Sequence, residues 1–207
     1  MYPSNVVDEL GLWSRFIDEY ADSMTHSDLE STSCITFIVL ADLTWQMPSP
    51  TIIDIKLGQF VPLKTLSLSK LQSHKAKYDS TTSSSLGLRL CGLKSRRLSK
   101  DKYWGRDLDH NSLSECLNLV ISDSMKRPLI SQLQGLLEVI MRDIVLRFYS
   151  ASLLIIIDED RGSCRVCMID FAHSGSKHIM QVHDNVELID INHGTVFGIQ
   201  NLISMLN

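Results

Sequence analysis

Two segments of the sequence place acidic and basic side chains where they could act together. Asp54 and Lys56 stand two residues apart in the run from Pro50 to Gly58, and in a strand this spacing points both side chains to the same face. A carboxylate beside an ammonium group suits phosphoryl transfer, in which catalysis is mostly positioning and charge stabilisation. Asp170 follows the apolar run 166–169, and a carboxylate there is a common Mg²⁺ ligand. Taken alone, Asp54 and Lys56 could equally be a surface pair, and Asp170 a helix cap.

The elements that must position these residues follow from the spacing of apolar side chains. Runs of β-branched or alternating apolar residues predict strands, over residues 35–40, 51–57, 86–92, 152–157 and 165–169. Helical spacing of apolar residues predicts helices, over residues 6–24, 66–78, 128–148 and 197–206. Ser112 and Glu115 have the spacing of a capping box, which predicts a further helix from Ser112 to about Lys126. Strands and helices are partly segregated, so the expected fold class is α+β.

Length and composition exclude several classes of protein. A chain of 207 residues with 44% hydrophobic and 21% charged residues can bury a core as one domain or a small two-lobed unit. No apolar run reaches the ~18 residues of a membrane span, and the N-terminus lacks the features of a secretory signal. Five cysteines are an odd number, which favours a reducing compartment, cytoplasm or nucleus, over a disulfide framework. Cys164 and Cys167 should point to opposite faces of one strand, which argues against a metal or redox pair.

The charge of the chain is distributed unevenly. The formal net charge is −4, which argues against a general nucleic-acid coat. Twelve of the twenty basic residues nevertheless lie between Lys56 and Arg106, where only Asp79 and Asp101 are acidic. This segment indicates either a polyanion-binding surface or an ordinary solvated basic face.

Three motifs occur in an order that resembles the inositol polyphosphate kinases, and within them the inositol hexakisphosphate kinases. They are the Pro-x-x-x-Asp-x-Lys-x-Gly pattern of residues 50–58, the Ser-Leu-Leu strand from Ser152 and the Ile-Asp-Phe-Ala-His end of a strand at residues 169–173. The resemblance extends from Ile35 to Leu206. It implies a two-lobed kinase-like fold with a reduced N-terminal lobe and hinge in residues 1–45. The C-terminal lobe would occupy residues 46–207 and hold an inositol phosphate-binding segment at about 59–85.

The resemblance also implies a role for individual residues. It assigns catalysis to Asp54, Lys56 and Asp170, with Asp170 as the Mg²⁺ ligand. Main-chain groups of the hinge would meet the adenine of ATP, and the implied nucleotide-binding residues are Ala41, Asp42, Leu43, Asp54, Ser152 and Asp170. The implied substrate-binding residues are Lys56, Lys70, Ser73, His74, Lys77, Arg89 and His173. A highly phosphorylated inositol needs many Lys and Arg donors on one side of the nucleotide site, which would explain the basic segment.

The function implied by the resemblance is an ATP- and Mg²⁺-dependent kinase that converts inositol hexakisphosphate to a diphosphoinositol pentakisphosphate. A kinase for less phosphorylated inositols and a catalytically silent polyanion-binding protein are the alternatives. The sequence departs from the family pattern at Ala41, where Glu is usual, and at Thr195, where an aromatic residue is usual. Residues 1–34 contain no lysine, so the lysine that reaches the ATP phosphates in the family has no counterpart there. The expected partner is an inositol polyphosphate, without nucleic acid.

Overall fold

The computed structural model describes residues 41–61, 66–142, 146–171, 174–176 and 191–207. The chain divides into two compact units, residues 1–41 and residues 42–207. Almost all of the first unit lies outside the described residues, including the helix predicted over 6–24 and the strand predicted over 35–40. The assignment of residues 1–45 to a reduced N-terminal lobe therefore stays a prediction.

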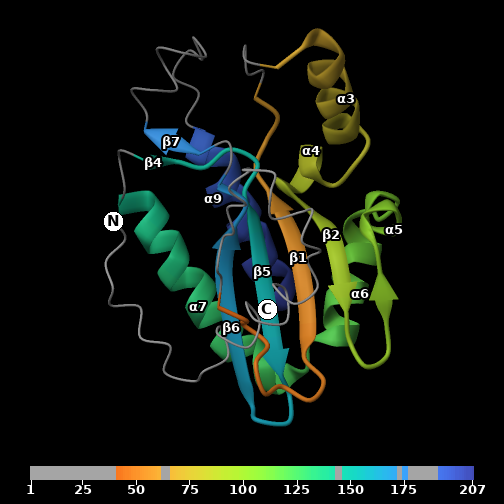
Figure 1. Ribbon diagram of the computed structural model, residues 1–207, viewed down its shortest axis with the longest axis vertical. Helices are drawn as coiled ribbons and strands as arrows, with labels where there is room; N and C mark the ends of the chain where they lie inside the picture. Colours follow the sequence, from red (N-terminus) through yellow and green to blue (C-terminus); the bar gives the residue numbers. More distant parts are fainter. Residues whose placement is uncertain (1–40, 62–65, 143–145, 172–173, 177–190) are drawn as a thin grey trace, which may run out of the picture. The chain divides into compact units, whose positions relative to one another are not determined.

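A five-stranded antiparallel sheet organises the second unit, with strand order β3-β2-β1-β5-β6. Figure 1 shows the central strand β1 between β2 and β5. The strands are β1 (Thr51–Leu57), β2 (Leu88–Lys94), β3 (Ser99–Lys100), β5 (Ser152–Asp158) and β6 (Ser163–Ile169). A separate antiparallel pair joins β4 (Leu146–Arg147) to β7 (Gly175–Ser176).

Residues alternate between the two faces of this sheet, as a strand period of two requires. In β1 the side chains of Ile53, Ile55 and Leu57 are buried in the core, whereas Asp54 and Lys56 lie on the opposite face. Asp54 and Lys56 therefore share a face, as their spacing predicts.

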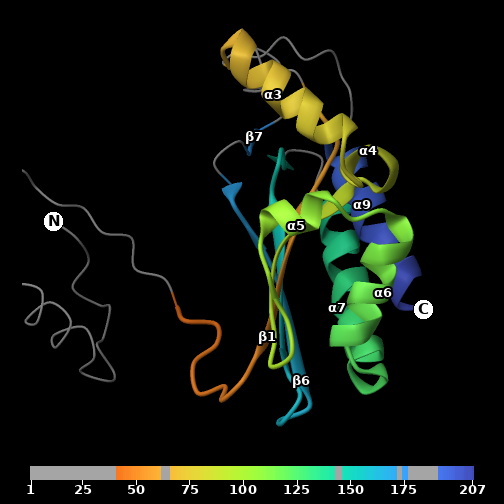
Figure 2. The ribbon, with the colours of Figure 1, turned by 90° about the vertical axis from the view of Figure 1, so that its right-hand side faces the viewer.

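Helices cover one face of the sheet (Figure 2). Leu113 and Leu117 of α6 (His110–Val120), Leu129 and Leu133 of α7 (Asp123–Arg142), and Ile199 and Leu202 of α9 (Ile191–Leu206) are buried in the same core as the inward side chains of β1. Within the described part of the chain, no helix lies over the face that carries Asp54 and Lys56. Three further helices, α3 (Leu68–Asp79), α4 (Ser83–Leu86) and α5 (Lys102–Arg106), lie near the β2 side of the sheet.

A glycine pair lets α9 approach the sheet at the end where β1 finishes and β2 begins. A Cβ atom on Gly198 would lie 2.4 Å from the Gly87 carbonyl oxygen, and one on Gly87 would lie 2.9 Å from the Gly194 carbonyl oxygen. Gly87 also has φ +66°, a conformation that side-chain-bearing residues rarely adopt. Backbone contact at this point fixes the turn that leads into β2.

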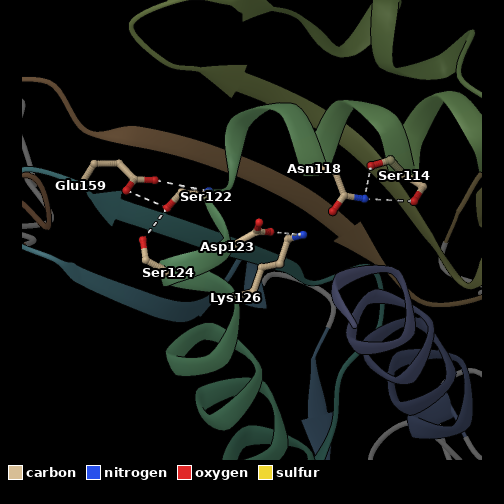
Figure 3. A network of polar contacts seen from close by, with 7 residues as sticks. All are labelled: Ser114, Asn118, Ser122, Asp123, Ser124, Lys126 and Glu159. Atoms are coloured by element: carbon tan, nitrogen blue, oxygen red, sulfur yellow. Dashed lines mark hydrogen bonds and ion pairs between the residues drawn. The ribbon is translucent and has the colours of Figure 1, made fainter.

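Side chains of the helical layer also tie down the far end of the β5–β6 hairpin. Glu159 accepts hydrogen bonds from the Ser122 hydroxyl at 2.8 Å and the Ser122 backbone N–H at 3.4 Å (Figure 3). Glu159 thus supplies a carboxylate to the N-terminal end of α7, where free amides favour an anion.

The exposed edge of β6 is covered by one glutamine of α7. The Gln132 amide donates to the Cys164 carbonyl at 2.8 Å and accepts from the Val166 N–H at 3.0 Å. Edge strands expose unpaired backbone groups that invite association with other chains. Gln132 satisfies two of these groups within the chain.

Most sequence predictions of secondary structure are confirmed, with corrections to the bounds of the helices. The α+β class, the strand 51–57 and the hairpin of β5 and β6 occur as predicted. Within β6, Cys164 faces the core and Cys167 faces the opposite side of the sheet, which is also as predicted. The predicted capping box of Ser112 and Glu115 is wrong. The box is formed by Asp109, which is the N-cap residue, and Ser112, which is its second member. One helix does not continue to Lys126, because α6 ends at Val120 and α7 begins at Asp123. Pro128 lies inside α7 and does not begin it. The helix predicted over 128–148 is also too long at its other end, because α7 ends at Arg142 and Leu146–Arg147 form the strand β4.

Candidate functional site

The candidate site lies where β1, β2, β5 and β6 present polar groups on the helix-free face. The register pairs Lys56 with Arg89 of β2 on one side and with Ser152 of β5 on the other. Ser152 in turn pairs with Ile169, the residue before Asp170. Four segments that are far apart in the sequence therefore meet in one row across the sheet.

Lys56 and Asp170 form an ion pair in this row. The Lys56 ammonium lies 3.0 Å from the Asp170 carboxylate, and the side chains are 17% and 58% exposed. Asp170 has φ +66°, and Ser150, just before β5, has φ +55°. Such left-handed conformations are uncommon for residues with a side chain and often occur at functional sites. Both residues stand at strand ends: Ser150 lines the same cavity as Lys56, and Asp170 pairs with Lys56.

Asp54 is the half-buried acid of the site. Burial is the main cause that raises the pKa of its carboxyl group, and the nearby Asp170 carboxylate adds to the rise. Hydrogen bonding from Ser152 and the positive charges of Lys56 and Arg89 lower the pKa in part. One oxygen of Asp54, Oδ1, is buried without a hydrogen-bond partner. A buried acceptor of this kind is unusual in a folded protein and marks a position where a ligand could supply the missing contact.

A cavity of about 230 Å³ opens beside Lys56. Its basic lining comes from three elements, with Lys56 on β1, His74 and Lys77 on α3, and Arg89 on β2. The rest of the lining comes mainly from residues 57–60, Tyr78, Tyr149 and Ser150. The Tyr149 hydroxyl donates to the Val61 carbonyl at 2.9 Å, which fixes the segment before β5 against the segment after β1. This concave, cationic surface suits an anionic ligand.

The charge inside the cavity is concentrated enough to affect its own members. Burial, followed by the positive charges of Arg106 and Arg89, lowers the pKa of the Lys77 ammonium group. Arg89 is oriented by a hydrogen bond from its Nη1 to the Ser83 hydroxyl at 2.9 Å. Cations that repel one another in this way are stabilised when an anion lies among them.

The structure brings together some of the predicted substrate-binding residues and separates others. Lys56, His74, Lys77 and Arg89 line the cavity. Lys70 and Ser73 belong to the same helix, α3, but are exposed and do not line it. Helix α3 extends away from the sheet (Figure 1), so its N-terminal turns lie farther from β1 than its C-terminal turn. His173 lies outside the described residues.

The predicted nucleotide-binding residues fall into two groups. Ser152 is buried beside Asp54, and Asp170 is paired with Lys56, as described above. Asp42 and Leu43 belong to a turn in which the Asp42 carboxylate accepts from the Thr44 backbone N–H at 2.8 Å and the Thr44 hydroxyl at 2.7 Å. Ala41 is exposed at the end of the first unit. The contact of these hinge residues with a nucleotide stays a prediction.

The residues of the site that sequence reasoning missed include Arg106, Tyr149 and Gln59. Tyr149 and Gln59 line the cavity, and Arg106 acts electrostatically on Lys77. Tyr149 lies between the predicted helix 128–148 and the predicted strand 152–157, and a polar aromatic residue there could have suggested a lining role. The pattern around Gln59 carries no comparable signal.

The carboxylates of the site fit a divalent cation. Mg²⁺ is usually held by one or two carboxylates, with phosphate oxygens and waters as the other ligands. Asp54 and Asp170 lie close enough for one charge to raise the pKa of the other, and Oδ1 of Asp54 lacks a partner. Groups of three or more His, Cys, Asp or Glu that could form a complete metal site do not occur in the described parts of the chain. The two acids therefore suit a divalent cation whose remaining ligands are phosphate oxygens and waters.

Comparison with known sequences identifies relatives along most of the chain. A model of the inositol polyphosphate kinase family matches residues 37–207. Inositol hexakisphosphate kinase 3 of Mus musculus is 32% identical over 222 residues, which cover 93% of this chain and 53% of the mouse protein. The inositol polyphosphate multikinase of Schizosaccharomyces pombe is 29% identical over 187 residues, covering 80% of this chain and 66% of that protein. The chain spans about half the length of the hexakisphosphate kinases it matches.

Solved structures support the fold. An inositol phosphate multikinase of S. cerevisiae, solved in complex with ADP and Mn²⁺, matches with a TM-score of 0.64 at 22% identity, covering 80% of each chain. A second inositol phosphate multikinase structure matches with a TM-score of 0.69 at 19% identity, covering 92% of this chain and 97% of the other. The predicted kinase-like fold of the inositol polyphosphate kinases is therefore confirmed. In the described residues no helix is long and apolar enough to cross a membrane.

Proposed function

Because this chain belongs to the inositol polyphosphate kinase family, we propose that it transfers the γ-phosphoryl group of ATP to inositol hexakisphosphate, giving a diphosphoinositol pentakisphosphate. The observation that carries the proposal is the cavity in which Lys56, His74, Lys77 and Arg89 converge beside the acidic residues Asp54 and Asp170. Lys56 lies where basic groups that could bind a polyanion adjoin acidic groups that could bind a divalent cation. Phosphoryl transfer requires both kinds of group.

The residues of the cavity would hold the acceptor. Lys77 and Arg89 supply ammonium and guanidinium donors to its phosphates, and Arg89 is already oriented by Ser83. A phosphate oxygen of the inositol polyphosphate would attack the γ-phosphorus, form the new P–O bond and displace ADP. Phosphate monoesters are largely ionised at neutral pH, because their second pKa is about 6. This acceptor therefore needs no general base.

Lys56 would neutralise charge that develops on the transferred group. It is 17% exposed, so water screens its charge poorly. Asp170, which follows β6, pairs with the ammonium group of Lys56 and so fixes the position of this charge beside the cavity. Fixed charges at the reacting centre are among the largest contributions to catalysis.

Asp170 and Asp54 would hold Mg²⁺, and Ser152, buried next to Asp54, would position that carboxyl group. When bound, the cation would screen the charges of the nucleotide phosphates. Ala41, Asp42 and Leu43 remain the proposed contacts for adenine, and Lys70, Ser73 and His173 the proposed outer contacts for the substrate. The four described cysteines are free thiols, which suits the cytoplasm or nucleus that we propose as the location.

A kinase for less phosphorylated inositols is the second candidate. It is favoured by the multikinase relative of Schizosaccharomyces pombe and by the two multikinase structures with the same fold. That reaction uses a ring hydroxyl as nucleophile, whose proton must be removed. Asp54, with its raised pKa, would be the base.

The test is a product analysis with the purified chain. It is incubated with Mg-ATP and either inositol hexakisphosphate or an inositol tetrakisphosphate, and the products are separated by anion exchange. We expect a product more anionic than inositol hexakisphosphate, lost in Lys56→Met. Lys126→Met is the control, because Lys126 belongs to α7 on the opposite face and pairs with Asp123.

Three other results would each mean something different. Faster turnover of the tetrakisphosphate would favour the second candidate. Binding of inositol hexakisphosphate without turnover would identify a silent polyanion-binding protein. Unchanged turnover in Lys56→Met would contradict the mechanism.

A further inference from the structure

Helix α5 carries a cation, Arg106, to which the proposed function assigns no role. We propose that Arg106, together with Lys77 and Arg89, binds a phosphate of the inositol polyphosphate other than the one that is phosphorylated. This inference rests on the proposed function and deepens it, because it gives the site a preference for inositols that carry phosphates on more than one side of the ring.

The position of α5 is fixed by a close backbone contact. A Cβ atom on Gly105 would lie 2.3 Å from the Leu90 carbonyl oxygen, so α5 rests directly on β2 at the residue after Arg89. Figure 1 shows α5 beside β2. The Asp101 side chain starts the helix by accepting hydrogen bonds from the N–H groups of Tyr103 and Trp104. Arg106, next to Gly105, is thereby held at the flank of the strand that carries Arg89.

Arg106 is held without an acidic partner. Its guanidinium lies 5.0 Å from the centre of the Tyr103 ring, and its Nε is buried without a hydrogen-bond partner. In the described part of the chain, no carboxylate forms an ion pair with Arg106, Lys77 or Arg89. A buried donor of a charged group that lacks an acceptor is costly, because burial removes its hydration. An anion among the three would offset that cost.

Arg106 and Arg89 both lie near enough to Lys77 for their charges to act on it. Arg106 and then Arg89 are the leading charges that lower the pKa of Lys77, after the effect of burial. Lys102, also on α5, contributes in the same direction. Charges from α3, β2 and α5 therefore surround one region, which adjoins the cavity through Lys77 and Arg89.

This region lies away from the reacting centre. Asp170 follows β6, which is three strands from β2 in the order β2-β1-β5-β6. Neighbouring strands are about 4.8 Å apart, so the axes of β2 and β6 are separated by roughly 14 Å. A phosphate beside Asp170 is therefore not the phosphate that Arg106 contacts. Lys56 and Arg89, paired on adjacent strands, link the two ends.

The test compares Arg106→Gln with Arg127→Gln by titration calorimetry, using inositol hexakisphosphate as the probe and no nucleotide. Arg127 is exposed on α7, on the opposite face of the sheet, and gives the same loss of charge. We expect Arg106→Gln to weaken binding about tenfold or more, because a hydrogen-bonded charge pair is lost. Arg127→Gln should bind as the unchanged protein does. Arg106→Lys keeps the charge and should recover part of the affinity, which separates the loss of a cation from a packing defect around Tyr103.

Equal affinities for Arg106→Gln and Arg127→Gln would overturn the inference, and so would a loss in Arg106→Lys as large as in Arg106→Gln. Binding is measured without turnover, so the result is independent of the proposed kinase activity. A protein that binds inositol hexakisphosphate through Arg106 but forms no product would keep this inference and refute the proposed function. If the protein forms product and Arg106→Gln binds inositol hexakisphosphate with unchanged affinity, the proposed function stands and this inference is refuted.

Discussion

The ammonium group of Lys56 lies 3.0 Å from the carboxylate of Asp170, and this contact joins the central strand of the sheet to the residue that ends its edge strand. The two residues are 114 positions apart in the sequence. The pair lies between a cationic cavity and an acid with an unpartnered oxygen. Its disruption should therefore affect chemistry more than folding, since Asp170 is 58% exposed.

Asp170→Asn should lower kcat about 100-fold or more, because it removes a charge that positions Lys56 and a proposed ligand for the divalent cation. Its midpoint of thermal unfolding should change less than its kcat does, because Asp170 is 58% exposed and an ion pair with an exposed carboxylate contributes only about 1 kcal/mol to stability. Asp160→Asn is the control, since Asp160 belongs to the β5–β6 turn and pairs with Arg96 of the segment between β2 and β3. Steady-state kinetics with Mg-ATP and inositol hexakisphosphate would check this. Equal kcat values for the two variants would refute the role of Asp170.

Asp54→Asn should stabilise the fold near neutral pH. The pKa of Asp54 is raised in the folded protein, chiefly by burial, so the ionised form disfavours folding. As pH falls below the folded pKa and then the unfolded pKa, the carboxyl group becomes neutral in both states and resembles Asn. The gain in unfolding midpoint should therefore be largest at pH 7 and shrink toward pH 3. Calorimetric scans across this range would check the trend.

A control with the opposite sign is available for that experiment. A hydrogen bond from Lys126, followed by its positive charge, lowers the pKa of the Asp123 carboxyl group. Asp123→Asn should therefore lower the unfolding midpoint at neutral pH, and the loss should disappear as pH falls through the pKa of Asp123. If Asp54→Asn and Asp123→Asn followed the same pH trend, burial would not be the dominant influence on Asp54.

Gly198→Ala should destabilise the protein by about 2–3 kcal/mol, because the added methyl group would meet the Gly87 carbonyl oxygen at 2.4 Å. Gly135→Ala makes the same change on α7, where nothing lies within 4 Å of the new atom. That variant should gain about 0.5–1 kcal/mol from the better helix propensity of Ala. Urea unfolding of both would check the contrast. Equal shifts would mean that α9 does not approach the sheet as described.

Gln132→Ala should cost about 1 kcal/mol and increase self-association, because it exposes the Cys164 carbonyl and the Val166 N–H on the edge of β6. Gln134→Ala, two residues along the same helix and also exposed, should have neither effect. Chemical unfolding and light scattering are the measurements. Unchanged scattering with unchanged stability in Gln132→Ala would show that the edge needs no cover.

The sequence could predict the strands and the centre of the site because their causes are local. The alternation in 51–57 determines which residues of β1 face the core, and the same alternation puts Asp54 and Lys56 together. The hairpin of β5 and β6 follows from two apolar runs around a polar turn. These patterns need no knowledge of distant contacts.

Other features depend on contacts that the sequence pattern does not encode. Asp109 and Ser112 are both residue types that cap helix N-termini, and the periodicity of apolar residues does not decide which of them begins α6. Helical spacing places Lys70 and Lys77 on one stripe, but the direction of α3 relative to the sheet leaves only Lys77 in the cavity. Arg106 joins the cationic cluster only because Gly105 docks α5 on β2. Tertiary packing decides each of these.

The most direct test of the central claim, that the cavity beside Lys56 binds the inositol polyphosphate substrate, compares Lys77→Met with Lys75→Met. Both lysines belong to α3, but Lys77 lines the cavity whereas Lys75 pairs with Asp79 on the exposed side of the helix. Steady-state kinetics should show KM for inositol hexakisphosphate raised about tenfold or more in Lys77→Met, and unchanged in Lys75→Met. Equal KM values for the two variants would contradict the claim that the substrate occupies this cavity.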